Sequence, residues 1–334
     1  MKLHALQYMR AIASMAVVYS HAVLQVPQYQ ALLHDAGGFG VDIFFVISGF
    51  IMVYIARPDD TPGRFIANRV RRVVPLYWFF TLLMAAILLI APSVFKSTSF
   101  DLAIILKSLL FIPHYSQADP TMIWPVVAPG WSLVFEMYFY LLFAASLVFP
   151  RAWRLWLISF CIFGVFLLAN QLPVDGAVAG FFRDAIVFEF ILGMALAAAF
   201  LRGFKLPNGI AWLLLLAGFS LLLLDLPGER FLKYGIPSLM IVAGTIYCSL
   251  PDNRFFVLLG DSSYALYLVH IFTLGVCRKL FPPFLGDGLP AAIIFVVLSM
   301  IACIVSGLMT HFVIDNWLLR RERLAMFSAQ PKTG

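Results

Sequence analysis

The chain has 334 residues, of which 62% are hydrophobic and 12% charged, and its mean hydropathy is +0.94. A soluble domain carries about 25% charged residues, so this composition excludes a soluble globular protein and indicates a membrane protein. The net charge of +6 fits the excess of basic residues on the cytoplasmic side of membrane proteins, and we expect no nucleic-acid partner.

The apolar residues fall in runs of roughly 18–22, the length of helix that spans about 30 Å of hydrocarbon. The alternation of polar and apolar residues that is typical of a membrane β-barrel is absent. We therefore predict an all-α fold, a polytopic integral membrane bundle of about ten transmembrane helices. The predicted spans cover residues 5–25, 38–56, 74–92, 131–149, 155–170, 178–200, 209–225, 234–250, 256–276 and 290–314.

The apolar stretch from Asp101 to Pro113 is about 12 residues long and contains Lys107, so it is short for a span. We predict a re-entrant or interfacial helix near residues 101–113. With ten spans, sixteen of the 23 Lys and Arg residues fall on the side of both termini, which predicts that both termini are cytoplasmic. If residues 101–113 crossed the membrane, the later loops would invert and this bias would largely vanish.

The chain shows no soluble domain, long linker or clear internal repeat. We predict one transmembrane domain over residues 1–320 and a short cytoplasmic tail over residues 321–334, because the last residues are polar.

Four ionisable residues stand in four different predicted spans: His21, Asp42, Glu136 and His270. Such residues cost about 2.5–3.5 kcal/mol each on insertion scales, so they usually face a bundle interior and often take part in chemistry. The predicted orientation places all four toward the extracytoplasmic face. We therefore expect them to converge at one level of the bundle.

Arg10 lies eleven residues before His21, which corresponds to roughly 16 Å along a helix. This places Arg10 toward the cytoplasmic side, near four arginines between residues 64 and 72 that precede the third predicted span. Guanidinium groups bind phosphates well. The pattern predicts an entrance lined by arginines on the cytoplasmic side and a centre of His and acidic residues nearer the extracytoplasmic side. A long phosphorylated donor could extend from the entrance to this centre.

Several of these residues also have a structural interpretation. The arginine cluster can serve topology and lipid contact alone, the two carboxylates can form structural hydrogen bonds between helices, and His270 can be a packing residue. Arg183, Asp184 and Glu189 form a further group that we interpret as a local ion pair.

Two other functional classes remain as alternatives. The intramembrane His and acidic residues can form the proton relay of a sugar or anion transporter, although the paired halves typical of such proteins are not visible. The same residue types can bind a metal, but no helical metal-ligand spacing supports this, and we expect no metal.

Five motifs together resemble the membrane-bound acyltransferase-3 family, and they extend from about Leu6 to Trp317. They are Arg10 followed after ten residues by His21, Gly40-Val-Asp42-Ile-Phe-Phe-Val-Ile-Ser48-Gly49-Phe50, Arg69-Val-Arg71-Arg72 with Pro75-Leu-Tyr77-Trp78, Gly130-Trp131-Ser132-Leu133-Val134-Phe135-Glu136-Met137-Tyr138-Phe139-Tyr140, and Ser263-Tyr264-Ala-Leu-Tyr267-Leu-Val-His270. The overall pattern resembles the exopolysaccharide-production branch most. Residues 311–316 depart from the pattern, so no role is carried over to Asp315.

The resemblance implies an O-acyltransferase of the bacterial inner membrane. Such an enzyme moves an acyl group, commonly acetyl, from cytoplasmic acetyl-coenzyme A to a carbohydrate hydroxyl on the extracytoplasmic side. The acceptor would be an exopolysaccharide, a lipid-linked glycan or an oligosaccharide, and membrane lipids would surround the protein.

The resemblance also implies roles for individual residues. His21 would act as general base or as acyl-carrying nucleophile, and Asp42 or Glu136 would orient its ring. The donor's phosphates would bind at Arg69 and Arg72, with Arg10 lining the tunnel above them. Substrate contacts are expected at Trp131, Ser132, Tyr264 and His270.

Overall fold

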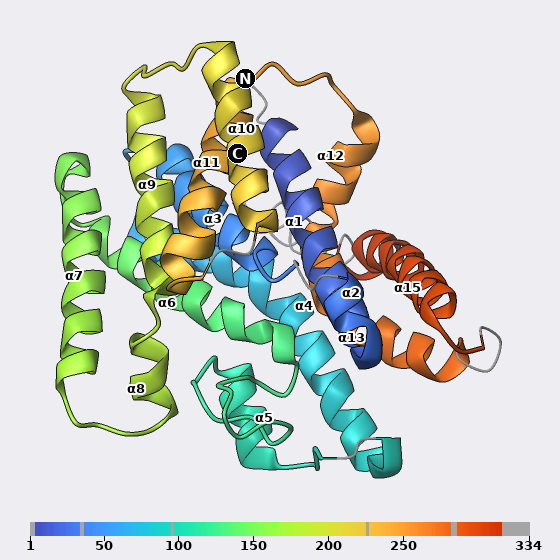
Figure 1. Ribbon diagram of the computed structural model, residues 1–334. Helices are drawn as coiled ribbons and strands as arrows, with labels where there is room; N and C mark the ends of the chain where they lie inside the picture. The colour runs from blue at the N-terminus through green and yellow to red at the C-terminus, as the bar shows by residue number, and fades with distance from the viewer. Residues whose placement is uncertain (1–3, 34–36, 95–96, 225–226, 282–285, 316–334) are drawn as a thin grey trace, which may run out of the picture.

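The structure is a computed structural model, and it describes residues 4–33, 37–94, 97–224, 227–281 and 286–315. Every regular element in these ranges is a helix (Figure 1), which confirms the predicted all-α class for the described part of the chain. The predicted tail, residues 321–334, lies outside the described residues.

The first half of the chain contains six α-helices and several short helical turns. In order these are α1 (His4–Val23), η1 (Pro27–Tyr29), α2 (Gln30–Leu33), α3 (Gly40–Ile55), α4 (Pro62–Ile90), η2 (Pro92–Val94), α5 (Leu102–Leu109), η3 (Ala128–Gly130) and α6 (Trp131–Ser146).

The second half continues the bundle with helices of more varied length. In order these are α7 (Arg151–Gln171), α8 (Ala177–Phe182), η4 (Ala185–Val187), α9 (Phe188–Leu201), α10 (Asn208–Leu223), η5 (Phe231–Gly235), α11 (Ile236–Tyr247), α12 (Arg254–Asp261), α13 (Ser263–Leu280), α15 (Leu289–Thr310) and η6 (His311–Asp315).

Long apolar helices mark the protein as a membrane protein. Among the described residues, three helices are long and apolar enough to cross a bilayer, or up to five if each of two bent helix pairs counts as one span. Four further apolar helices have 10–17 residues: Gly40–Ile55, Ala185–Leu201, Asn208–Leu223 and Phe231–Tyr247. The predicted number of about ten spans stays a prediction.

The stretch near residues 101–113 forms only the eight-residue helix α5. Eight residues rise about 12 Å, well short of the hydrocarbon thickness. The carboxylate of Asp101 caps the helix by accepting from Ala103 N (2.8 Å) and Ile104 N (3.2 Å), and the helix ends before Phe111, whose φ is +56°. The predicted short helix is therefore present.

The predicted span 178–200 is wrong as a single helix, because the chain breaks into α8, η4 and α9. Arg183 turns its side chain back and donates to the carbonyls of Ala169 (2.7 Å), Leu172 (3.0 Å) and Val174 (2.8 Å) at the end of α7. Asp184 then begins η4 by accepting from Ile186 N at 3.0 Å. The expected local ion pair of Arg183 is replaced by these backbone contacts.

Two other predicted spans differ from the observed helices at their N-terminal ends. The span 256–276 is divided into α12 and α13, which meet at a bend of 68°. The third span begins at Pro62 rather than near residue 74, because Thr61 caps α4 and accepts from Arg64 N at 3.4 Å. The arginines between residues 64 and 72 therefore lie on a helix, which fixes the faces they occupy.

Helix α3 lies at the centre of the bundle and packs tightly against α9 (Figure 1). A Cβ atom on Gly49 would lie 2.2 Å from the carbonyl oxygen of Phe190, and one on Gly193 would lie 2.0 Å from that of Val46. Small residues that allow such close backbone approach are typical of helix contacts in membranes.

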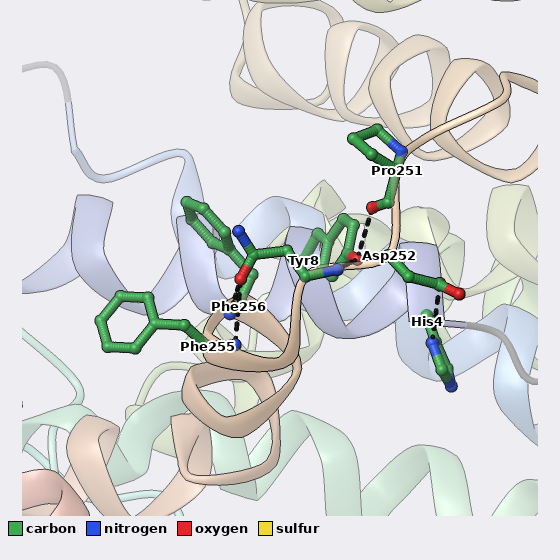
Figure 2. Close-up of polar contacts among 7 residues, drawn as sticks. His4, Tyr8, Pro251, Asp252, Phe255 and Phe256 are labelled. Atoms are coloured by element: carbon green, nitrogen blue, oxygen red, sulfur yellow. Dashed lines mark hydrogen bonds and ion pairs between the residues drawn. The ribbon is translucent and has the colours of Figure 1, made fainter.

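The connection between α11 and α12 is tied to the start of α1, as Figure 2 shows. The Tyr8 hydroxyl donates to Pro251 O (2.8 Å) and accepts from Asn253 N (2.6 Å), and His4 Nδ1 lies 3.2 Å from Asp252 Oδ1. This connection and the turn between α9 and α10 lie at the same end of the molecule as the start of α1, whereas α5 and the turn between α7 and α8 lie at the other end (Figure 1).

Candidate active site

A cavity of about 110 Å³ opens between α1, α3, α4, α6 and α13. Three guanidinium groups line it, those of Arg10 from α1 and of Arg69 and Arg72 from α4, together with the carboxylate of Glu136 from α6. We call this space the arginine cavity. It brings together three residues that the sequence predicts as one donor-binding group.

The arginines keep much of their hydrogen-bonding capacity available to a ligand. Arg10 Nη1 donates to Gln7 Oε1 at 3.2 Å, and the Arg69 guanidinium lies 5.7 Å above the ring of Phe65. The buried Nε atom of Arg69 has no hydrogen-bond partner among the described residues. Because each guanidinium has five N–H donors, the cavity is suited to bind an anion with several oxygen atoms.

Glu136 is half-buried and lines the arginine cavity. Its Oε1 atom accepts from the Ser48 hydroxyl at 3.2 Å and from the Tyr140 hydroxyl, one helical turn further along α6. The carboxylate thus orders two hydroxyl groups and adds a negative charge beside the three arginines.

Tyrosine hydroxyls form the wall of the arginine cavity toward α13. The Tyr267 hydroxyl lies 2.8 Å from the Ser132 hydroxyl and donates to Pro129 O at 2.8 Å. Tyr264 donates to Val73 O at 2.6 Å. Two predicted substrate-contact residues, Ser132 and Tyr264, therefore line this cavity.

His21 and His270 contact each other directly, although 249 positions separate them in the chain. Nδ1 of His21 lies 3.0 Å from Nε2 of His270, and the ring centroids are 5.0 Å apart. The His270 ring is fully buried and lies beside Tyr267, with ring centroids 6.1 Å apart. The histidine pair therefore sits behind the tyrosine wall of the arginine cavity.

Asp42 forms a bidentate ion pair with Arg230, the residue before η5. Arg230 Nε lies 3.1 Å from Asp42 Oδ1, and Nη2 lies 2.7 Å from Oδ2. Asp42 is fully buried, and Arg230 also covers the ring of Trp131 at 5.7 Å. Glu189 is fully buried as well, and its carboxyl group lies against that of Asp42.

The four residues that we expected to converge have different partners in the structure. His21 and His270 contact each other, whereas Asp42 pairs with Arg230 and Glu136 lines the arginine cavity. His270 is fully buried against His21. The expected role of Asp42 or Glu136 in orienting the His21 ring, and the expected substrate contact of His270, stay predictions.

Sequence reasoning missed Arg230, Tyr140 and Tyr267. Arg230 was only a basic residue in a predicted loop, and nothing in the sequence paired it with Asp42. Tyr140 has a usable signal, because it follows Glu136 by four residues and so shares its helix face. Across the described residues, no group of three or more His, Cys, Asp and Glu side chains is placed to hold a metal ion.

Comparisons with known proteins show the family to which the chain belongs. The family model of the acyltransferase domain, acyltransferase-3, matches residues 3–309. The exopolysaccharide production protein ExoZ of Rhizobium meliloti (strain 1021) is 36% identical over 307 residues, covering 88% of this chain and 93% of that protein. The acyltransferase MdmB of Streptomyces mycarofaciens is 26% identical over 378 residues, covering 99% of this chain and 96% of that protein. No solved structure matches significantly. The chain belongs to the acyltransferase-3 family and is an acyltransferase.

Proposed function

We propose that the protein is a membrane-embedded O-acyltransferase that moves an acetyl group from acetyl-coenzyme A to a carbohydrate hydroxyl. The donor enters from the cytoplasm, and the acceptor is an exopolysaccharide or a related glycan on the other side of the bacterial inner membrane. The arginine cavity is the observation that carries this proposal. The printed name of the relative ExoZ supports the exopolysaccharide context.

The donor's phosphates suit the three guanidinium groups. Coenzyme A carries a diphosphate and a further phosphate, and arginine binds phosphate through paired N–H donors. In the proposal Arg69 and Arg72 hold the phosphates and Arg10 lies further along the cavity. The thin pantetheine arm then extends toward Ser132 and Tyr267, and the thioester approaches the histidine pair.

The contacts of His270 support a choice between the two nitrogens of His21. His270 Nδ1 lies 3.3 Å from Leu266 O, and a carbonyl only accepts, so in the proposal this nitrogen carries the hydrogen of the neutral ring. Nε2 of His270 then accepts from Nδ1–H of His21 across 3.0 Å. In this tautomer the lone pair of His21 is on Nε2.

That lone pair serves either of two chemical routes. As general base, Nε2 takes the hydroxyl proton while the sugar oxygen attacks the thioester carbonyl, and the departing thiolate receives the proton. As nucleophile, Nε2 attacks the thioester carbonyl, the C–S bond breaks and an acyl-imidazole forms with release of the thiolate. The sugar oxygen then attacks this acyl group, the C–N bond breaks, and the hydroxyl proton passes through the imidazole to the thiolate. Both routes release coenzyme A and leave the acetyl group on the sugar.

The proposal is tested by following radiolabelled acetyl-coenzyme A with purified protein and de-O-acetylated cell-envelope glycans. We expect label on the glycan and release of coenzyme A. Changing Arg69 and Arg72 both to Ala removes charged hydrogen bonds and should raise the KM for acetyl-coenzyme A by about tenfold or more.

The matched control is Arg71→Ala, because Arg71 stands between the two and does not line the arginine cavity. It should leave the KM for the donor near the wild-type value. An equal effect of Arg71→Ala would refute the donor site, and failure of the wild type to consume acetyl-coenzyme A would refute the proposed donor.

A further inference from the structure

A second cavity, with a volume of about 370 Å³, lies at the α5 end of the molecule. It is enclosed by α5, the loop over residues 111–127, the start of α6, α8 and Arg230. We call it the α5 cavity. Its size falls within the range of about 300–1,000 Å³ that is typical of small-molecule sites.

Aromatic side chains provide the flat surfaces of the α5 cavity. Trp124 and Trp131 are both half-buried, and Phe135 stacks on Phe181 with ring centroids 4.0 Å apart. Within the described ranges neither indole N–H has a hydrogen-bond partner, although both rings line the cavity. Two aromatic faces with two unused N–H donors are suited to a ligand that has both an apolar face and hydroxyl groups.

Charged side chains supply the remaining polar groups of the α5 cavity. Asp184 Oδ1 accepts from Ile186 N at 3.0 Å, which leaves Oδ2 for a ligand hydroxyl. Arg230 uses Nε and Nη2 for Asp42, so its other N–H groups are available, and Lys107 is exposed at the rim. Hydrogen-bond donors and a hydrogen-bond acceptor therefore line the α5 cavity.

The roof of the α5 cavity is held in place by hydrogen bonds to α4. Tyr77 donates to Ser108 O at 3.1 Å and Trp78 donates to Leu109 O at 2.8 Å. The Ser108 hydroxyl in turn accepts from Val126 N at 3.0 Å. The loop that carries Trp124 is thus fixed against the bundle, and the cavity is formed before a ligand arrives.

Aromatic side chains lie between the α5 cavity and the arginine cavity. Phe45 lines the arginine cavity, whereas Trp131 and Phe135 line the α5 cavity. The ring of Phe45 lies 6.3 Å from that of Trp131 and 6.1 Å from that of Phe135. Ser132, the neighbour of Trp131, faces the arginine cavity. The two cavities therefore approach each other from opposite ends of the molecule.

We propose that the α5 cavity is the acceptor subsite, where a pyranose unit of the carbohydrate stacks on the indole rings of Trp124 and Trp131. The indole N–H groups and Asp184 bind its hydroxyl groups. This inference rests on the proposed function, because it gives the acceptor a place across the aromatic wall from the donor. A purely apolar ligand would cover the remaining polar atoms of Asp184 and Arg230 without binding them, which disfavours it.

The test compares variants of the α5 cavity with a control on the same loop. Trp124→Ala removes the stacking face, and Asp184→Asn removes the charge while its amide oxygen can still cap η4. Tyr115→Ala is the control, because Tyr115 is exposed and does not line the α5 cavity. The acceptor is the organism's own exopolysaccharide, de-O-acetylated with alkali and partially hydrolysed to oligosaccharides.

We expect both cavity variants to raise the acceptor KM by about tenfold, while Tyr115→Ala leaves it unchanged. The KM for acetyl-coenzyme A and the slow release of coenzyme A without acceptor should stay at wild-type values in all three. An unchanged acceptor KM in Trp124→Ala and Asp184→Asn, with normal use of the donor, would overturn the subsite and leave the proposed function standing.

A direct binding measurement separates the two proposals if the wild type does not use the donor. Hydrogen exchange of the loop over residues 111–127 is followed with and without the same oligosaccharides. Protection that is lost in Trp124→Ala supports the α5 cavity as a carbohydrate site, and absence of protection in the wild type contradicts it.

Discussion

His21 and His270 contact each other through ring nitrogens, Nδ1 of the first and Nε2 of the second. In the proposed mechanism the His270 ring takes the place that a carboxylate holds in a catalytic triad, because it accepts the Nδ1 hydrogen of His21 and keeps the lone pair on Nε2. A neutral ring in this place adds no negative charge inside the membrane, where a charge is costly. In the proposed mechanism His270 is a positioning residue that acts through His21.

Substitution of His270 tests this positioning role. His270→Ala removes the acceptor for Nδ1–H and should lower kcat by about 10–100-fold, the loss that is common for removal of a residue that orients a reacting group. The KM values for donor and acceptor should change little. His270→Gln, whose side-chain oxygen can accept the same hydrogen bond, should restore part of kcat.

Steady-state kinetics of the three proteins decide the matter. Equal kcat values for His270→Ala and the wild type would show that the pair has no part in the reaction. An equal loss of kcat in His270→Ala and His270→Gln would show that the loss does not come from the missing hydrogen bond to His21.

The sequence predicts the identities of many cavity residues but not their neighbours. Arg10, Arg69 and Arg72 line one cavity as expected, because their spacing and charge place them at the same depth. The sequence did not indicate that Asp42 pairs with Arg230 or that Glu136 accepts from Ser48 and Tyr140. Hydropathy and charge bias give the depth of a residue along its helix, whereas the face of the helix and the order of helices around the bundle decide its partners.

At the scale of elements, the contact between α3 and α9 depends on glycine. Gly193→Ala would place a Cβ atom 2.0 Å from the carbonyl oxygen of Val46, so the helices must move apart. Overpacking of this kind costs about 1–3 kcal/mol. We expect a lower melting temperature for the purified variant in detergent.

Gly164→Ala on α7 is the matched control, because a Cβ atom there meets no other atom within 4 Å. Alanine favours a helix over glycine by about 0.5–1 kcal/mol, so this variant should be as stable as the wild type or slightly more stable. Equal melting temperatures of Gly193→Ala and Gly164→Ala would contradict the close contact between α3 and α9.

Most elements were predictable to within a few residues, and the exceptions have local causes. The predicted spans 5–25 and 131–149 correspond to α1 and α6, since apolar length alone marks them. The predicted span 178–200 breaks where Arg183 reaches the carbonyls of α7. A side chain that finds partners in another part of the chain leaves no pattern in its own segment.

At the scale of the whole molecule, the two ends have different chemistry. The end that carries the start of α1 also carries the turn between α9 and α10, with Arg202 and Lys205. The other end carries α5 and the α5 cavity. The cytoplasmic location of the termini stays a prediction. In the proposal, donor and acceptor enter from these two ends, with the aromatic wall of Phe45, Trp131 and Phe135 between them.

Transfer across a sealed membrane tests the central claim most directly. The purified protein is reconstituted into liposomes with the de-O-acetylated oligosaccharides trapped inside, and radiolabelled acetyl-coenzyme A is added outside. We predict that labelled acetyl groups appear on the trapped oligosaccharides with the wild type and are absent with His21→Ala. Release of coenzyme A without labelled oligosaccharide inside, or equal labelling by His21→Ala, would contradict the account.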